Sequence, residues 1–330
     1  MDFHGLAEAA RKLAPSAPSV FSPASVPAFK IYHLSLFVAA IAAAIFAVVV
    51  GLMAYAVIKY RRRADDDGRE PVQIYGSNQI ELAWTVIPFL IVIVLFLTSA
   101  RAIHEIQDRR MPPGALEVTV VGHQFWWELR YPQYGVVTAN ELHVPVSDPD
   151  HPWPTALTLL SADVVHSFWA PQLAGKTDLI PGQVNHTWIE PVRPGVYLGQ
   201  CAMYCGAQHA HMLLRVIAEP RADFERWIRD QKKPPVRDPL VAAGRGIFET
   251  TACINCHSLA GTSADGRFGP NLNHLMSRDT LGAGVLSNTS ANLRRWVDDP
   301  GAVKPGCLMP AMKLRPRQLS RLVAYLETLR

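Results

Sequence analysis

The chain has little cysteine, little net charge and, over two long stretches, no charged side chains. Its 330 residues include five cysteines, four of them in two tight pairs, which does not fit the disulfide framework of a small secreted domain. The formal net charge is +4, so the sequence carries no strong signal for nucleic-acid binding. Aspartate, glutamate, lysine and arginine are all missing from residues 31–58 and 82–100. The length of the chain allows about two or three domains. The two uncharged stretches indicate membrane spans, and the two cysteine pairs indicate two cofactor sites.

The two uncharged stretches predict a pair of transmembrane helices. A helix needs about 20 apolar residues to cross the hydrocarbon core of a bilayer, and we expect spans at about 31–60 and 82–102. Pro88 falls inside the second span, where a neighbouring helix can compensate for a kink. A buried pair of soluble helices is the alternative. Runs of this length and apolarity favour the membrane, as does a mean hydropathy just above zero.

The segment between the predicted spans, residues 61–81, is rich in basic side chains. The positive-inside rule places such a loop in the cytoplasm, so both termini and everything after about Arg101 are expected outside, in the periplasm or its equivalent. Residues 1–30 are predicted to be a loose N-terminal segment with a short amphipathic helix near residues 6–13, and no ordinary signal peptide is recognisable there. The basic residues in and next to the loop are Lys59, Arg61, Arg62, Arg63 and Arg69.

The sequence pattern of residues 113–219 predicts a series of short strands. Apolar and polar residues alternate from Leu116 to Val121, and residues 125–131 are rich in aromatic side chains. More short apolar segments follow, separated by turns with Pro and Gly, a spacing typical of an all-β sandwich or barrel. Residues 220–239 are predicted to form a short helix and then a charged, proline-containing linker that separates two domains semi-rigidly.

One loop of the chain combines thiols, an imidazole and a thioether. Cys201 and Cys205 are four residues apart, His209 follows four residues later, and Met212 three after that. Soft sulfur and borderline nitrogen are the ligand set that suits copper. Zinc, which two Cys and two His also satisfy, and a disulfide are the alternatives. Zinc leaves the methionine unused and a disulfide explains neither histidine of the loop, so the pattern favours copper.

A second motif, Cys253-Ile-Asn-Cys256-His257, is typical of c-type haem attachment. Each thiol adds to a haem vinyl group and the histidine supplies one axial bond. The motif alone gives false positives, but its surroundings from 240 to 330 resemble the all-α class I cytochromes c. That resemblance implies Met309, after a Pro-Gly turn, as the second axial ligand, with Met312 as the alternative. The remaining cysteine of this region, at position 307, is left unpaired.

The copper loop sits in a wider pattern with Asp163-Val-Val-His166-Ser-Phe-Trp-Ala-Pro171 and Gly175-Lys-Thr-Asp178. This pattern resembles the binuclear copper (CuA) site of subunit II of haem–copper cytochrome c oxidases. The resemblance implies a cupredoxin-like Greek-key sandwich over 113–219, with two coppers bridged by two thiolates. The family pattern gives His211 no metal. The implied ligands are His166, Cys201, the main-chain carbonyl of Met203, Cys205, His209 and Met212.

Two positions depart from the family pattern and a third agrees with it. Met203 stands where the family has a glutamate that helps to hold magnesium against subunit I, and its lack of a hard side-chain oxygen argues against that contact. Phe125 stands where the family has the tryptophan that receives electrons, so Trp126 or the adjacent Trp127 is a candidate replacement. Glu81 matches an acid at the mouth of a proton path into subunit I; a solvated helix end is its plain alternative.

Three blocks follow one another along the chain: a transmembrane helical hairpin (31–103), a copper domain (113–219) and a cytochrome c domain (240–330). This order resembles subunit II of caa-type cytochrome c oxidases of bacterial inner membranes. The resemblance implies one covalently bound haem c and two coppers. Electrons would pass from a soluble cytochrome c or a bc-type complex through haem c and CuA to subunit I, where O2 is reduced to water and protons are pumped. Subunit III is a further implied partner, and no residue of this chain is itself catalytic.

Three other functions remain open from the sequence. The first is a CuA-containing subunit of a nitric oxide reductase, which differs only in its catalytic partner. The second is a structural subunit II without copper that carries only haem c. The third is a membrane-anchored electron shuttle with no catalytic partner. The complete ligand set argues against the second, and Glu81 with the family-like hairpin argues against the third.

Overall fold

The computed structural model describes residues 15, 17–62, 73, 75–107, 111–148, 150–235 and 238–330. The chain divides into two compact units, which are treated separately: residues 29–110, and residues 111–330 together with the segment up to 28. The helix expected near residues 6–13 lies outside the described residues, as does most of the predicted cytoplasmic loop.

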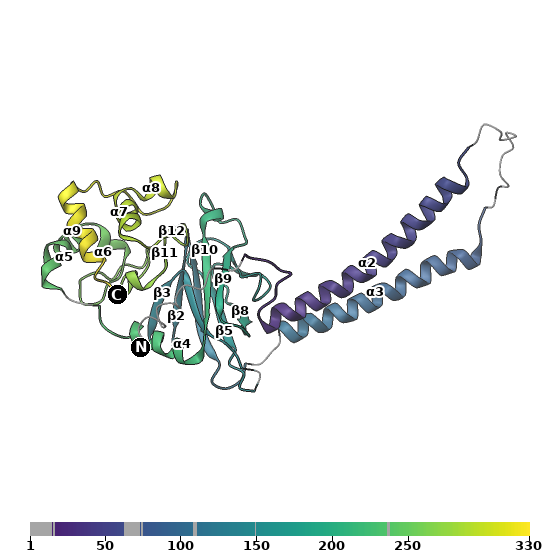
Figure 1. Ribbon diagram of the computed structural model, residues 1–330, viewed down its shortest axis with the longest axis horizontal. Helices are drawn as coiled ribbons and strands as arrows, with labels where there is room; N and C mark the ends of the chain where they lie inside the picture. The colour runs from purple at the N-terminus through teal and green to yellow at the C-terminus, as the bar shows by residue number, and fades with distance from the viewer. Residues whose placement is uncertain are drawn as a thin grey trace, which may run out of the picture. The chain divides into compact units, whose positions relative to one another are not determined.

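The smaller unit is a hairpin of two long apolar helices (Figure 1). Helix α2 spans Val26–Lys59 and α3 spans Asn78–Gln107, and both are long and apolar enough to cross a membrane. Helix α2 begins before the predicted span, and α3 extends beyond its predicted span at both ends through charged and polar residues. Lys30, near the start of α2, and Glu105, near the end of α3, form an ion pair of 2.9 Å.

The strand-rich domain of the larger unit is a sandwich of two five-stranded sheets within the described residues. One sheet has the order β3-β2-β1-β5-β8 and the other β4-β10-β9-β6-β7. Parallel pairing of β1 with β5 and of β10 with β4 joins strands that are distant in sequence. The strands are β1 (Leu116–His123), β2 (Trp126–Tyr131), β3 (Val136–Ala139), β4 (Glu141–Pro145), β5 (Thr155–Ser161), β6 (His166–Trp169), β7 (Thr177–Leu179), β8 (Asn185–Ile189), β9 (Gly195–Cys201) and β10 (Leu213–Glu219).

Alternating burial along the strands builds the core between the two sheets. On β10 every second residue is buried, and β1 and β5 show the same period over most of their length. This is the pattern that a strand with one face on a core requires. Helix α4 (Arg221–Gln231) adds Phe224 and Ile228 to this core, so the first part of the predicted linker segment packs on the sandwich.

The C-terminal domain is mainly helical and has a core of its own. Helices α5 and α9 pack so closely that a Cβ atom at Gly244 would lie only 2.1 Å from the carbonyl oxygen of Arg321. Glycine, which has no Cβ, permits this approach. A short ribbon, β11 (Thr280–Leu281) with β12 (Leu286–Ser287), is an addition that the helical pattern did not predict. The helical segments are η2 (Pro239–Val241), α5 (Ala242–Thr250), α6 (Cys253–Cys256), η3 (Leu275–Ser277), α7 (Ser290–Asp298), α8 (Pro300–Val303) and α9 (Pro316–Leu326).

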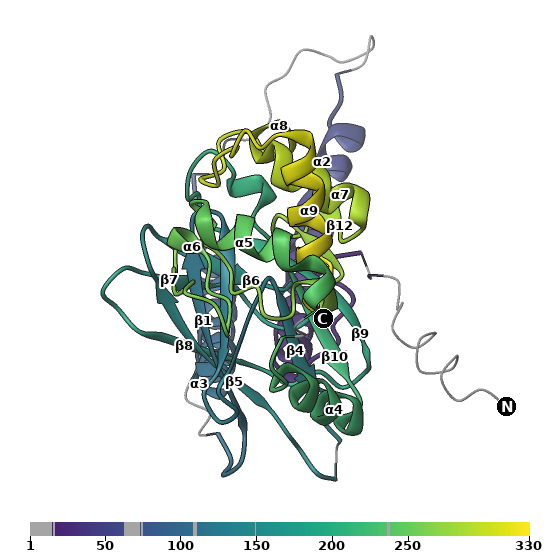
Figure 2. The same ribbon diagram turned by 90° about the vertical axis from the view of Figure 1, so that its left-hand side faces the viewer.

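The sandwich and the helical domain belong to the same compact unit. Figure 2 shows α5, α6, α7 and α9 gathered over one end of the strands. The predicted fold class is confirmed: two apolar helices, an all-β sandwich and a helical cytochrome c-like domain, in that order along the chain.

Candidate copper and haem sites

The two cysteines of the copper loop lie side by side beneath an imidazole from a neighbouring strand. Cys201 ends β9, and His166 begins β6, which pairs with β9. The Sγ atom of Cys201 is 3.9 Å from the Sγ of Cys205 and 3.9 Å from Nδ1 of His166. All three side chains are buried, and their ligand atoms lie within 4.8 Å of one another. The sandwich therefore brings together groups that are 35 residues apart in sequence.

The other predicted ligand groups close around the same two sulfurs. Nδ1 of His209 lies 3.7 Å and Sδ of Met212 lies 3.9 Å from the Sγ of Cys205. The carbonyl oxygen of Met203 lies 3.1 Å from the Sγ of Cys201. All six predicted groups thus lie around the two buried sulfurs. His211 does not: it is exposed, and its Nδ1 contacts the side-chain oxygen of Gln208 at 2.8 Å.

His166 is held in place by contacts on the side away from the sulfurs. Its Nε2 lies 2.8 Å from Oδ1 of Asp163, whose carboxylate also accepts from the main-chain N–H groups of Gln124 and Val164. A Cβ atom at Gly122 would lie 2.7 Å from the imidazole, so only glycine leaves room for this ring position. Burial opposes the imidazolium, but the contacts with Asp163 and Cys201 together outweigh it and raise the pKa of His166. A carboxylate behind a ligand histidine is the usual way to fix the ring's orientation.

The two thiols differ in acidity. Contact with Cys205 lowers the pKa of Cys201, against the opposing effect of burial and with help from His166. The same contact, together with burial, raises the pKa of Cys205. One thiolate therefore forms readily, and a bound cation is needed to stabilise the second. With sulfur and nitrogen donors and a single carbonyl, the pocket fits a soft or borderline metal and not calcium or magnesium.

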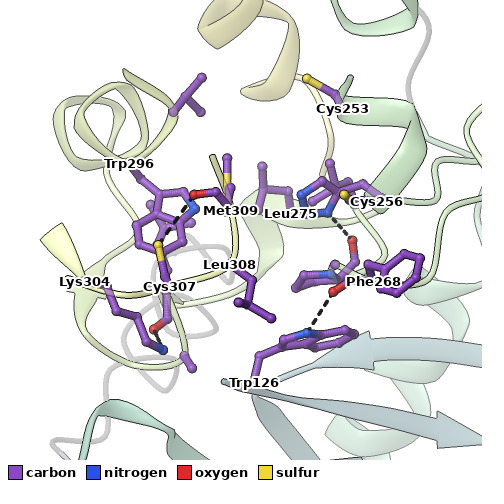
Figure 3. A pocket seen from close by; sticks show the side chains of 18 of the residues that line it. Trp126, Cys253, Cys256, Phe268, Leu275, Trp296, Lys304, Cys307, Leu308 and Met309 are labelled. Carbon is purple, nitrogen blue, oxygen red and sulfur yellow. Dashed lines mark hydrogen bonds between the residues drawn. The ribbon is translucent and has the colours of Figure 1, made fainter. Parts of the chain in front are cut away.

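The Cys-x-x-Cys-His motif lines a cavity of about 410 Å³ (Figure 3). Its lining is mostly apolar and comes from several helices of the C-terminal domain and from the loop that carries Met309. The loop also brings Met312 to the cavity, so both predicted axial candidates reach it. Six residues that the sequence analysis singled out line this cavity: Cys253, Cys256, His257, Cys307, Met309 and Met312.

The imidazole of His257 is oriented for ligation. Its Nδ1 lies 2.7 Å from the carbonyl oxygen of Pro270, so Nδ1–H donates there and Nε2 is left with a lone pair. A Cβ atom at Gly269 would lie 2.6 Å from the ring, which explains the glycine at this position. Burial lowers the pKa of His257 and so keeps the imidazole neutral, the form that binds iron.

One buried cation on the cavity wall also fits a haem. Arg278 lines the cavity and is fully enclosed, and its Nε has no hydrogen-bond partner. Burial lowers the pKa of Arg278 to about 10, so the guanidinium is charged at neutral pH. One Nη of Arg278 donates to the carbonyl oxygen of Asn271, and the free Nε–H leaves the guanidinium a donor for one of the two carboxylates that haem carries. The cavity thus supplies thiols, an imidazole, thioethers and a cation, a set of groups that fits haem c.

The aromatic residues named as electron acceptors occupy different places. Trp127 is fully buried in the sandwich, edge-on to Phe168. Phe125 and Trp126 are each 7% exposed, and both line the haem cavity from the sandwich side. The Trp126 ring stacks on His123 at 4.3 Å, and its indole N–H donates to the carbonyl oxygen of Phe268 at 3.2 Å, as Figure 3 shows.

Some residues that shape the two sites were not singled out in the sequence. Asp163 stands three residues before His166, and that spacing was a usable signal for its supporting role. Arg278 and Lys304 line the haem cavity, but no local pattern distinguishes them from surface cations. Glu81, which was singled out, is exposed in the first turn of α3, in the other compact unit.

Three family models match the chain, and together they cover its three blocks. "Cytochrome C oxidase subunit II, transmembrane domain" matches residues 16–101. "Cytochrome C oxidase subunit II, periplasmic domain" matches residues 151–219, and "Cytochrome c" matches residues 241–330. The order is the one that the motifs predict.

Curated relatives match over most of their length. The chain is similar to the "Cytochrome c oxidase subunit 2" of Alkalihalophilus pseudofirmus, with 34% identity over 291 residues, which cover 86% of this chain and 82% of the relative. The protein of the same name from Bacillus sp. (strain PS3) is 33% identical, with coverage of 82% and 80%. That from Bacillus subtilis is 30% identical, with coverage of 94% and 92%.

Proposed function

Because this chain belongs to the cytochrome c oxidase subunit II family, with a cytochrome c domain at its C-terminal end, we propose that it is the subunit through which electrons enter a membrane-bound terminal oxidase. A soluble cytochrome c or a bc-type complex is the proposed donor. Haem c and a binuclear copper centre lie on the proposed route to subunit I, where O2 is reduced and protons are pumped. The observation that carries the proposal is the gathering of two thiols, two imidazoles and a thioether in one buried pocket, in the same unit as a haem-binding cavity.

The proposed copper site uses the six groups that face this pocket. The thiolates of Cys201 and Cys205 would both hold the metal pair, and each imidazole would hold one copper. The sulfur–sulfur distance of 3.9 Å and the buried position of both cysteines support this assignment. Bound copper would supply one-electron redox chemistry at this site. Asp163 keeps the His166 ring in the ligating orientation, and the rigid sandwich limits movement between oxidation states. We propose no magnesium ligand at Met203.

The proposed haem site uses the thiols of Cys253 and Cys256 for covalent attachment and His257 as one axial ligand. Met309 is the second axial ligand, with Met312 as the alternative. A thioether opposite a histidine raises the haem potential, which suits a carrier late in an electron-transfer chain. The Pro270 carbonyl holds the imidazole in the ligating tautomer.

We propose domain boundaries at 31–103 for the hairpin, 113–219 for the copper domain and 240–330 for the cytochrome c domain. The basic residues after Lys59 support a cytoplasmic position for the loop 61–81, and hence a periplasmic position for both cofactor domains. Subunit I, subunit III and the lipid membrane are the proposed partners. Glu81, in the first turn of α3 next to that loop, is proposed to lie at the mouth of a proton path into subunit I.

Purification of the chain from native membranes tests this function. We expect it to co-purify with a large haem a-containing subunit, and the complex to consume O2 when supplied with reduced cytochrome c. Cys205→Ser should abolish this uptake. Turnover of nitric oxide but not of O2 would favour the reductase alternative. Isolation without any large partner would contradict the proposal.

A further inference from the structure

The two loops that carry the cofactor ligands are in direct contact. The side-chain N–H of Gln208, beside the predicted ligand His209, donates to the carbonyl oxygen of Pro305. At the next position a Cβ atom on Gly306 would lie 3.1 Å from the methyl group of Ala207, so only this small side chain separates the backbones of the loops. Gly306 also has a φ of +82°, which favours glycine. The loop that ends at Met309 therefore rests on the copper loop.

A buried lysine next to this contact donates hydrogen bonds to both domains. Lys304, which opens the Met309 loop, is 3% exposed. Its ammonium donates to the carbonyl oxygen of Phe125 in the sandwich at 2.9 Å and to that of Gly282 in the helical domain at 3.0 Å. Hydrogen bonds from a charged donor are among the stronger ones, and an ammonium that lost these acceptors while still buried would be costly. Lys304 therefore favours the joined arrangement over a partly opened one.

A buried carboxylate makes a second tie away from both ligand loops. Glu141 on β4 is 2% exposed, and its oxygens accept from the main-chain N–H of Asp279 and of Thr280, each at 2.9 Å. They also accept from the Thr280 hydroxyl at 2.6 Å. The main-chain N–H of Leu213, the first residue after the copper loop, donates to the carbonyl oxygen of Ala283 at 3.2 Å. The sandwich thus holds the β11–β12 ribbon by several buried polar contacts.

We infer that Lys304 and Glu141 are positioning residues that lock the cytochrome c domain onto the copper domain in one fixed arrangement. The domain is then a docked relay and not a carrier that swings on its linker. This inference rests on the proposed function. With the loops held together, the residues that would hold haem c and those that would hold copper keep one spacing, so one electron given up by ferrous haem c, which would become ferric, would reduce the copper pair by one electron. The soluble donor would replace that electron.

Hydrogen exchange of the full-length chain tests the lock without reference to activity. The amides of Leu213 and Thr280 both donate across the interface, so their protection reports on docking. Lys304→Met keeps the side-chain length and removes the charge, and should speed exchange at both amides by about tenfold or more. Amides between β1 and β5, inside the sandwich, should not change. Lys304→Arg should restore protection at least in part, and Lys233→Met, at an exposed lysine, should have no effect.

Glu141→Gln is the second variant, and it decides the question if Lys304→Met fails to fold. It should speed exchange at Thr280 in the same way and slow electron transfer from haem c to copper after flash photoreduction, with unchanged haem and copper spectra. Unchanged exchange at both amides in a folded variant would overturn the lock. A chain that binds haem but no copper would contradict the proposed function, yet its exchange pattern would still report on the lock.

Discussion

The Sγ atoms of Cys201 and Cys205 lie 3.9 Å apart, about twice the length of a disulfide bond. Both thiols are free in the structure, so the disulfide alternative raised by the sequence is not the state seen here. The pair faces two imidazoles and a thioether that a disulfide would leave unused. The separation leaves both sulfurs available to bridge a metal pair, and the predictions on the copper site depend on it.

Replacing one bridging sulfur should break the binuclear centre. In Cys205→Ser the hydroxyl is a harder and much weaker copper ligand than a thiolate. We expect at most about one copper per chain and loss of the signal from an electron shared between two coppers, with covalent haem unaffected. Metal analysis and EPR on the purified chain measure this. Cys307→Ser is the matched control, and full copper in Cys205→Ser would remove this cysteine from the ligand set.

Asp163 should matter to copper although it does not face the sulfurs. Asp163→Asn weakens the contact that orients His166, and changes of this kind cost about 10–100-fold in metal affinity. Competition with a copper chelator measures the effect. Asp148→Asn, at an exposed position, is the control and should bind as the unmodified chain does. Equal affinity in the two variants would mean that His166 needs no support.

The copper-free chain should hold one thiolate at neutral pH. The pKa of Cys201 is lowered and that of Cys205 is raised, so there is a range of pH in which only Cys201 is ionised. A lowered pKa gives a charge that is present above it and is lost as the pH falls through it. We therefore expect thiolate absorbance near neutral pH that is lost on acidification and is missing in Cys201→Ser. Absorbance that appears only in alkali would contradict this assignment.

The sequence predicted the architecture because the signals for it are local. Uncharged runs mark membrane spans, alternation marks strands such as β10, and ligand spacing within one loop marks the copper site. The apolar runs do not show where the helices themselves begin and end, which is at Val26–Lys59 for α2 and Asn78–Gln107 for α3. The helices continue past their apolar cores, where Lys30 and Glu105 pair with each other, and hydropathy does not report such an extension.

The contacts between the two cofactor domains could not be predicted. Lys304 and Phe125 are 179 residues apart, and Glu141 and Thr280 are 139 apart, with no periodic pattern linking them. In the sequence the lysine looks like part of a turn and the glutamate like an exposed strand residue. Their burial depends on how two finished domains pack, which no local propensity encodes. For the same reason the sequence could not show that Trp126 lies against the haem domain.

Met309 should set the haem potential without holding the haem. Met309→Ala removes the sulfur ligand of the methionine and leaves the covalent bonds from Cys253 and Cys256 to the haem intact. We expect haem to stay attached and its potential to fall by a sizeable part of the about 0.8 V range that axial ligands set. Redox titration of the chain measures this, with Met312→Ala as the control. A fall in the control and none in Met309→Ala would transfer the axial role to Met312.

Trp126 should speed electron transfer between the two cofactor sites, because its ring lines the haem cavity while its strand belongs to the copper domain. Trp126→Phe removes the indole and its hydrogen bond to Phe268 but keeps an aromatic ring. We expect electron transfer after flash photoreduction to slow severalfold, because the hydrogen bond that joins this ring to the helical domain is lost. Trp153→Phe, on the sandwich away from the cavity, should leave the rate unchanged, and equal rates in both variants would exclude Trp126 from the route.

The most direct test of the central claim is metal analysis with EPR and optical spectra on the full-length chain, matured with haem and copper. Two coppers and one covalent haem c per chain, with an EPR signal from one electron shared by both coppers, is the predicted result. A single zinc, or haem without copper, would contradict the copper assignment and leave a membrane-anchored cytochrome c on a structural sandwich.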